Sequence, residues 1–85
     1  MPWNIIIARR ALKDLEHLSS GDQTAVRDKI SQLGIDPGSV DLKKLVGTES
    51  EWRMRVGHWR VIVELDNNAG QIRVLRVKSR KEAYN

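Results

Sequence analysis

The chain has 85 residues and carries 15 Lys/Arg against 11 Asp/Glu, which gives it a formal net charge of +4. A chain of this length builds one small core, so the sequence predicts a single domain over residues 1–85. Cysteine is absent and only two histidines occur, which excludes disulfide bridges and cysteine-based metal sites, and we expect no catalytic metal and no cofactor. No apolar run approaches the roughly 18–20 residues of a membrane span, and the N-terminus lacks the basic start of a signal peptide. We therefore expect a cytoplasmic protein with no membrane partner.

The positive charge is concentrated in the second half of the chain. Residues 1–42 hold five Lys/Arg and six Asp/Glu, whereas residues 43–85 hold ten and five. This asymmetry favours a polyanionic partner, nucleic acid first, bound by the C-terminal half. The same positive charge would attract an acidic protein, so that alternative stays open.

The first third of the chain predicts a strand followed by two helices. Residues 3–7 are short, apolar and β-branched, which is typical of a buried strand. Ser20 followed by Gln23 matches a capping box that opens the second helix, and Gly34 and Pro37 end it. We expect an antiparallel helical hairpin that covers one face of a sheet. The apolar stripe of its first helix is Ala8, Ala11, Leu12, Leu15 and Leu18.

Residues 34–51 predict a long loop with turn-forming residues at both ends. Leu42 and Leu45 are expected to fix this loop to the core. Lys43 and Lys44 are then expected to face solvent, near the basic residues that follow.

Residues 52–65 predict a β-hairpin. Apolar and polar residues alternate from Trp52 to Val56, and the run from Trp59 is rich in β-branched residues. Gly57-His58 fits a two-residue loop with glycine first, the type II′ pattern. Such a turn fixes the register as Trp52 with Val63, Arg53 with Ile62, Met54 with Val61, Arg55 with Arg60, and Val56 with Trp59.

This register sorts the side chains of the hairpin onto two faces. Arg53, Arg55 and Arg60 share one face, and an arginine directly across from an arginine is destabilising by itself. The arginines are either an unconnected solvated surface or a site for an anion, which a basic stripe indicates. The other face is apolar and predicts the core, with Trp52, Met54, Val56, Trp59, Val61 and Val63.

Residues 71–78 predict the last strand. With Leu65 paired to Gln71, alternation places Arg73 in the core, which a one-residue shift or a β-bulge would avoid. The same register predicts Arg76 opposite Arg60, Lys78 opposite His58, and Leu75 and Val77 on the core face.

The order of these elements resembles the RelE/ParE superfamily of bacterial toxins. The likeness extends from Ile5 to Tyr84, and it depends on the order and spacing of its motifs together. The resemblance implies an α+β fold, in which an antiparallel sheet of about four strands is backed by an N-terminal helical hairpin, in the order β-α-α-β-β-β. The motifs are Lys44-Leu45-Val46-Gly47, then Arg53-Met54-Arg55-Val56-Gly57 with Trp59-Arg60, and finally Arg80-x-x-x-Tyr84.

Within the superfamily, RelE-type members cut mRNA in the ribosomal A site, and ParE-type members poison DNA gyrase. The resemblance favours a RelE-like toxin, a ribosome-dependent and metal-independent mRNA endoribonuclease whose partners are an antitoxin, the ribosome and mRNA. A gyrase inhibitor without nuclease activity stays open as the alternative, and a catalytically silent RNA-binding module is a third. The catalytic residues that the resemblance implies are Arg53, Arg55, Arg60, Arg80 and Tyr84.

Metal-free RNA cleavage needs a base for the attacking 2′-hydroxyl, charge stabilisation on the phosphate, and support for the leaving 5′-oxygen. Arg55 and Arg60 suit the second task, because guanidinium binds phosphate bidentately and keeps its charge. By resemblance, Arg80 would support the leaving group and Tyr84 would act as the base or stack on a nucleobase. Candidates for contacts with RNA or the ribosome are Lys43, Lys44, Arg76, Lys78 and Lys81.

Overall fold

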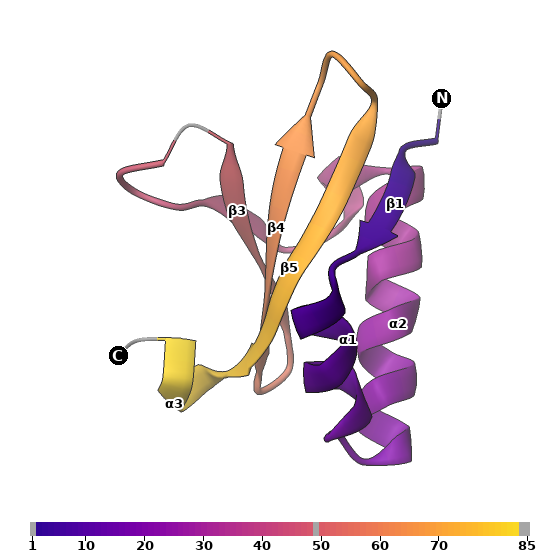
Figure 1. Ribbon diagram of the computed structural model, residues 1–85, viewed down its shortest axis with the longest axis vertical. Helices are drawn as coiled ribbons and strands as arrows, with labels where there is room; N and C mark the ends of the chain where they lie inside the picture. The colour runs from indigo at the N-terminus through magenta and orange to yellow at the C-terminus, as the bar shows by residue number, and fades with distance from the viewer. Residues whose placement is uncertain (1, 49, 84–85) are drawn as a thin grey trace.

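The computed structural model describes residues 2–48 and 50–83. Its sheet has the strand order β1-β5-β4-β3-β2, and helices α1 and α2 cover one face of it (Figure 1). The predicted α+β class, with a helical hairpin behind the sheet, is confirmed. No helix in the described part of the chain is long and apolar enough to cross a membrane. The elements are β1 (Asn4–Ile7), α1 (Arg9–Glu16), α2 (Ser20–Ile35), the 3-10 helix η1 (Pro37–Ser39), β2 (Leu42–Lys44), β3 (Glu51–Val56), β4 (Trp59–Asp66), β5 (Gln71–Ser79) and α3 (Arg80–Ala83).

The β3–β4 hairpin has the predicted register, with Arg55 opposite Arg60 and Trp52 opposite Val63. Gly57 has a φ of 57°, whereas His58 does not have a positive φ. A type I′ turn needs positive φ at both central residues, and a type II′ turn needs it only at the first. The turn is therefore type II′, as its sequence predicts.

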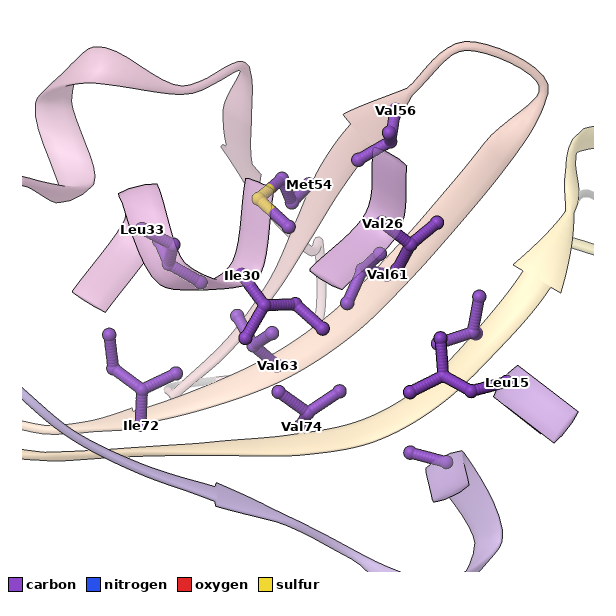
Figure 2. Packing of buried hydrophobic residues seen from close by; sticks show 12 residues of the cluster. Leu15, Val26, Ile30, Leu33, Met54, Val56, Val61, Val63, Ile72 and Val74 are labelled. Carbon is purple, nitrogen blue, oxygen red and sulfur yellow. The ribbon is translucent and has the colours of Figure 1, made fainter. Parts of the chain in front are cut away.

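The apolar face of this hairpin forms one wall of the core. Met54 and Val61 are fully buried, and Trp52 and Trp59 pack against the core while remaining partly exposed. Burying one such aliphatic side chain contributes roughly 1.5–3 kcal/mol, so these contacts dominate the energetics of a small domain. Figure 2 shows how residues of both helices meet the sheet, among them Leu15, Val26, Ile30 and Leu33.

Two features of the sheet differ from the prediction. Strand β1 pairs with β5 in parallel, with Asn4 opposite Gln71, so the sheet is mixed rather than antiparallel. The predicted loop at residues 34–51 contains β2, which adds a fifth strand to the edge of β3. Alternation indicates which side chains face the core, but it specifies neither strand direction nor a strand of only three residues.

The register of β5 differs from the prediction in two steps: Leu65 pairs with Ile72 rather than Gln71, and a β-bulge follows at Leu75. Ile62 pairs with Arg76 and Val63 pairs with Val74, so Leu75 has no partner across the ladder. The extra residue reverses the alternation on the N-terminal side of the bulge. Leu75 is therefore half-exposed instead of lying in the core as predicted.

The changed register also moves the charged residues of β5. Arg73 lies exposed on the solvent face opposite Glu64, which confirms the alternative that the sequence left open for it. Lys78 lies opposite Arg60. Three predicted pairs are therefore wrong: Leu65 with Gln71, Arg76 with Arg60, and Lys78 with His58.

Helix α2 begins one residue earlier than its predicted capping box. Ser19 is the N-cap, and its hydroxyl accepts a hydrogen bond of 3.2 Å from the Asp22 N–H. The Gln23 amide instead donates to the Leu15 carbonyl oxygen at 2.9 Å, which ties α2 to the end of α1. The predicted cap at Ser20 is therefore wrong, because two adjacent serines offer the same chemistry.

Gly34 lies inside α2 rather than ending it. A Cβ at this position would lie 3.0 Å from two side-chain carbons of Ile5. The Gly34 carbonyl oxygen also accepts a hydrogen bond of 2.7 Å from the Trp3 N–H. The glycine is needed here because β1 approaches the helix closely.

Asp14 of α1 protects the edge of β5 beyond the end of β1. Strand β1 pairs with β5 only as far as Val74, so the Val77 N–H would otherwise lie on an open edge. It donates to Asp14 Oδ2 at 2.9 Å, and Arg76 Nε donates to the same oxygen at 2.8 Å. Partial burial alone would raise the pKa of the Asp14 carboxyl, but these hydrogen bonds and the charge of Arg76 keep the pKa below its usual value.

We expect Asp14→Asn to lower the free energy of unfolding by about 1–2 kcal/mol at pH 7, because the amide loses the charge-assisted bonds. A lowered pKa means that this stabilisation is complete at neutral pH and is lost as the pH falls below about 4. Urea unfolding at a series of pH values measures the difference between the two proteins, which should shrink in acid.

Glu16→Gln is the matched control, because Glu16 is an exposed carboxylate on the same helix. Its effect should stay within about 0.5 kcal/mol. An Asp14→Asn effect that does not change with pH would show that the carboxylate charge is not responsible.

Candidate functional site

The sheet face opposite α1 and α2, called here the outer face, carries a basic region. Helix α3 lies on this side of the sheet (Figure 1). The strand registers place cationic side chains from three neighbouring strands on the outer face. These side chains are Arg53 and Arg55 of β3, Arg60 of β4, and Arg73, Arg76 and Lys78 of β5.

A hollow of about 220 Å³ opens in this region, and we call it the arginine hollow. Four of its lining residues are cationic and one is a carboxylate. Sites for complete small molecules usually measure about 300–1,000 Å³, so this space suits a single charged group such as a phosphate. The lining residues are Asp41, Lys43, Arg53, Arg55 and Arg60.

Arg60 is the buried member of the arginine hollow, with an exposed fraction of only 3%. Its Nη1 donates to the Gly57 carbonyl oxygen at 3.1 Å and to the Trp59 carbonyl oxygen at 3.0 Å. A guanidinium has five N–H donors, so these two bonds leave donors for the hollow. The β3–β4 turn therefore holds the Arg60 side chain in a fixed position.

Arg55 lies directly opposite Arg60, yet it is exposed. Its backbone N–H donates to the backbone carbonyl oxygen of Asp41 at 2.9 Å, and this bond brings Asp41 to the rim of the hollow. One carboxylate among four cations offsets only part of their repulsion. An anion in the hollow would relieve the rest, which favours the anion-site interpretation of the three arginines.

The structure does not bring every predicted catalytic residue into the arginine hollow. Arg80 begins α3, and its backbone N–H donates to the His58 carbonyl oxygen at 2.7 Å. This bond places the Arg80 backbone at the β3–β4 turn, but its exposed side chain is not among those that line the hollow. Tyr84 lies outside the described residues.

The residues predicted to contact RNA or the ribosome are also divided. Lys43 lies opposite Arg53 and lines the arginine hollow, as expected of a residue near the arginines. Lys44 lies opposite Trp52, so the alternation of β2 directs it to the other face. Lys81 is exposed on α3.

Arg76 and Lys78 line a second hollow, of about 330 Å³, which we call the mixed hollow. It adjoins the arginine hollow, because Arg53 lines both. Arg76 is also ion-paired with Asp14. The lining residues are Leu45, Glu51, Arg53, Ile62, Leu75, Arg76 and Lys78.

Sequence reasoning missed the mixed hollow. The sequence predicts that Leu45 and Leu75 face the core, and it gives no sign that Asp41 and Glu51 lie beside the arginines. One signal was present, because the predicted pairing of Arg53 with Ile62 already placed an apolar residue on the basic face. The β-bulge that brings Leu75 beside it has no clear mark in the sequence.

Another hollow, of about 400 Å³, lies at the other end of β4 and has the opposite chemistry. Its described lining includes two carboxylates and neither lysine nor arginine, so it disfavours a phosphate. No group of three or more metal-ligating side chains occurs in the described part of the chain. The lining residues of this hollow are Ser50, Glu64, Leu65, Asp66, Asn67 and Asn68.

Almost the whole chain matches a known toxin family. Residues 5–84 match the family model of the ParE toxin of the type II toxin–antitoxin system parDE. The chain is also 32% identical over 87 residues to the candidate toxin RelE1 of Methanocaldococcus jannaschii, covering 96% of this chain and 93% of that protein. The chain belongs to the ParE/RelE toxin family.

Solved structures of RelE systems share the fold of this toxin. A chain of the archaeal RelE–RelB complex from Pyrococcus horikoshii superposes with a TM-score of 0.81 at 26% identity, covering 94% of this chain and 97% of that chain. A chain of the RelBE2 toxin–antitoxin complex from Mycobacterium tuberculosis gives a TM-score of 0.83 at 23% identity, covering 93% and 92%. The family resemblance predicted from the motifs is thus confirmed.

Arg60 and Arg55 form a matched pair for a stability measurement. We expect Arg60→Ala to lower the free energy of unfolding by about 1–3 kcal/mol, because two turn carbonyls lose a buried charged donor. Arg55→Ala should change it by no more than about 0.5 kcal/mol, because that side chain is exposed. Urea unfolding of the three proteins measures both effects. Equal effects would contradict the anchoring of Arg60 by the turn.

Proposed function

We propose that this toxin is a ribosome-dependent mRNA endoribonuclease that cleaves in the A site. The observation that carries the proposal is the arginine hollow, in which four cationic side chains surround a space of about 220 Å³. Guanidinium groups bind phosphate bidentately and stay charged at every physiological pH. The hollow therefore has the size and charge to hold one RNA phosphate.

The proposed reaction is the metal-independent attack of a ribose 2′-hydroxyl on its neighbouring phosphate. A bond forms between the 2′-oxygen and phosphorus, and the bond to the 5′-oxygen breaks, so that one product carries a cyclic phosphate. Negative charge on the phosphate oxygens increases as the transition state forms. Arg60 would stabilise this charge at little cost of reorganisation, because the turn already holds it in place. Arg55, which lies opposite Arg60 in the β3–β4 ladder, would bind the same phosphate.

Arg53, Arg80 and Tyr84 complete the proposed catalytic set. Arg53 lines the arginine hollow and would share in phosphate binding. Arg80 begins α3 beside the β3–β4 turn, from which its long side chain would support the leaving 5′-oxygen. Tyr84, outside the described residues, would act as the base or stack on a nucleobase.

The proposed site depends on the ribosome because its own acid–base groups are weak. Neither histidine lines the arginine hollow: His58 is exposed in the turn, and the His17 ring is hydrogen-bonded to the Lys13 carbonyl oxygen on α1. Arginine is a poor proton donor, so much of the acceleration must come from positioning of the RNA for in-line attack. We therefore propose that the toxin acts on translating ribosomes in the cytoplasm and scarcely cuts free RNA.

We also propose that a cognate antitoxin binds this toxin. Two structures with the same fold are RelE–RelB and RelBE2 complexes. A disordered acidic or amphipathic segment that folds on binding would cover the basic outer face or the helices. The excess of Lys/Arg in residues 43–85 would favour an acidic segment.

The second candidate function is inhibition of DNA gyrase without nuclease activity. The family model that matches residues 5–84 describes a ParE toxin, which is the observation in its favour. A protein that acts only by binding gyrase has no need of a phosphate-sized hollow lined by arginines. The nuclease proposal is therefore preferred.

Mapping of RNA 5′ ends after induction of the toxin tests the two candidates together. The nuclease predicts new ends inside translated codons, at the positions that ribosomes present in the A site, and an intact chromosome. A gyrase inhibitor predicts trapped double-strand DNA breaks and no new ends of this kind. DNA breaks without codon-phased RNA ends would reject the nuclease.

We expect Arg55→Ala to reduce cleavage of ribosome-bound mRNA by about 100-fold, the typical cost of removing one group that stabilises the transition state. Primer extension on stalled, purified ribosomes gives the rate. Arg73→Ala is the control, since it removes the same charge from an exposed residue that lines neither the arginine hollow nor the mixed hollow. A similar loss in both variants would mean that overall charge, rather than the hollow, accounts for the activity.

A further inference from the structure

The mixed hollow has an apolar centre on a face of the sheet that is otherwise charged. Leu45 follows β2, Ile62 lies in β4, and Leu75 is the bulged residue of β5. All three are half-buried and line the same space. Where one face of a sheet is open to water, its outward positions are normally polar. A β-bulge can redirect a side chain beside a binding site, and here it brings Leu75 to the hollow.

The wall that carries Leu45 is held against β3 by hydrogen bonds. The Leu45 N–H donates to the Glu51 carbonyl oxygen at 3.0 Å. The Thr48 hydroxyl lies 3.2 Å from the Leu45 carbonyl oxygen and 3.4 Å from that of Glu51, so it bridges the two backbones. The hollow is therefore largely formed before any ligand binds, which reduces the entropy cost of binding.

Charged groups surround this apolar centre. Arg53, Arg76 and Lys78 contribute three cations to the lining, and Glu51 contributes its carboxylate. Glu51 lies directly opposite Glu64 in the β3–β4 ladder, and two facing carboxylates are destabilising. A ligand that donates hydrogen bonds to Glu51 would relieve this repulsion.

We infer that the mixed hollow binds the nucleobase of the nucleotide next to the phosphate in the arginine hollow, and that it prefers guanine to uracil. This inference rests on the proposed function, since it assumes that the bound polyanion is RNA. The base would lie against Leu45, Ile62 and Leu75, because any base has an apolar face. At about 330 Å³ the space is larger than the arginine hollow and falls within the usual range for a small-molecule site.

The preference for guanine follows from the lining groups. Guanine presents two adjacent N–H donors on its Watson–Crick edge, which one carboxylate of Glu51 can accept together. Its O6 accepts hydrogen bonds from Arg or Lys, and three such side chains surround the hollow. Uracil offers a single ring N–H between two carbonyl oxygens. A carboxylate repels these two oxygens. Sequence-specific proteins commonly read unpaired RNA through these base edges.

A nucleobase fits the mixed hollow better than the apolar side chain of a protein partner. Arg53 lines both hollows, so a group in one lies next to a group in the other. A nucleotide supplies a phosphate and a base at this spacing, together with donors for Glu51. An aliphatic side chain would fill the apolar centre but would leave Glu51 desolvated and without a new donor.

Binding of short uncleavable RNA tests the inference on the intact toxin. We would titrate it with 2′-O-methyl trinucleotides whose central base is G or U and follow amide chemical shifts by NMR. We expect G to bind about tenfold or more tightly than U, with shifts at Leu45 and Leu75. Glu51→Gln should abolish most of this preference. Glu64→Gln should keep most of it, because Glu51 still offers its carboxylate to guanine and Glu64 lines a different hollow, although the repulsion between the two carboxylates is lost.

Three results of the trinucleotide titrations would overturn the inference. They are equal affinity for G and U, a preference that Glu51→Gln leaves unchanged, and trinucleotide shifts that avoid the mixed hollow. Leu75→Ala adds a check: it should weaken every trinucleotide, whereas Leu12→Ala, at an exposed leucine of α1, should weaken none. If Leu75→Ala weakens antitoxin binding alone, the hollow belongs to a protein partner and the inference fails.

The test separates this inference from the proposed nuclease. If wild-type toxin cuts ribosome-bound mRNA but the cut positions show no dependence on Glu51, the nuclease stands and the base subsite fails. If the trinucleotides bind as expected but no ribosome-bound mRNA is cut, the base subsite stands and the nuclease fails.

Discussion

The type II′ turn at Gly57-His58 is the constraint on which the core and the candidate site both depend. A two-residue loop fixes the register of β3 and β4, and a slip of one residue would move Met54 to solvent and Arg53 into the core. The same turn supplies the two carbonyl groups that hold Arg60, and its His58 carbonyl accepts the N–H that begins α3. One short turn thus couples burial of the apolar face to convergence of the arginines.

The charge on the outer face becomes less positive with distance from this turn. The row nearest the turn, in which Arg60 lies between Arg55 and Lys78, is wholly cationic. Four residues further along β3, a carboxylate faces a carboxylate, Glu51 against Glu64. At about 3.3 Å per residue the two rows are roughly 13 Å apart, which exceeds the Debye length of about 8 Å in physiological salt. The carboxylates therefore do not cancel the attraction of the arginine hollow for a polyanion, but they favour its binding at the turn end.

The β3–β4 hairpin was predictable because its turn chemistry and its alternation agree at every position. The position of β5 was not, because its pairing at the β4–β5 turn is one residue off, with Ile72 opposite Leu65, and the bulge at Leu75 then breaks the alternation from which register is inferred. Strand β2 is too short to show a pattern, and Ser19 and Ser20 offer equal caps, which explains the one-residue error at α2. The grouping of Arg53, Arg55 and Arg60 followed from the hairpin alone. The apolar centre of the mixed hollow joins residues from three segments, and local patterns do not report that kind of contact.

The proposed mechanism depends most on the position of the scissile phosphate. The most direct measurement is a cryo-electron microscopy structure of the toxin on a ribosome whose A-site codon is protected by 2′-O-methyl groups. We predict that oxygens of the phosphate next to the modified ribose lie within about 3 Å of guanidinium nitrogens of Arg55 and Arg60. A bound toxin that presents its helices to the mRNA, with both arginines directed away from every phosphate, would contradict the account.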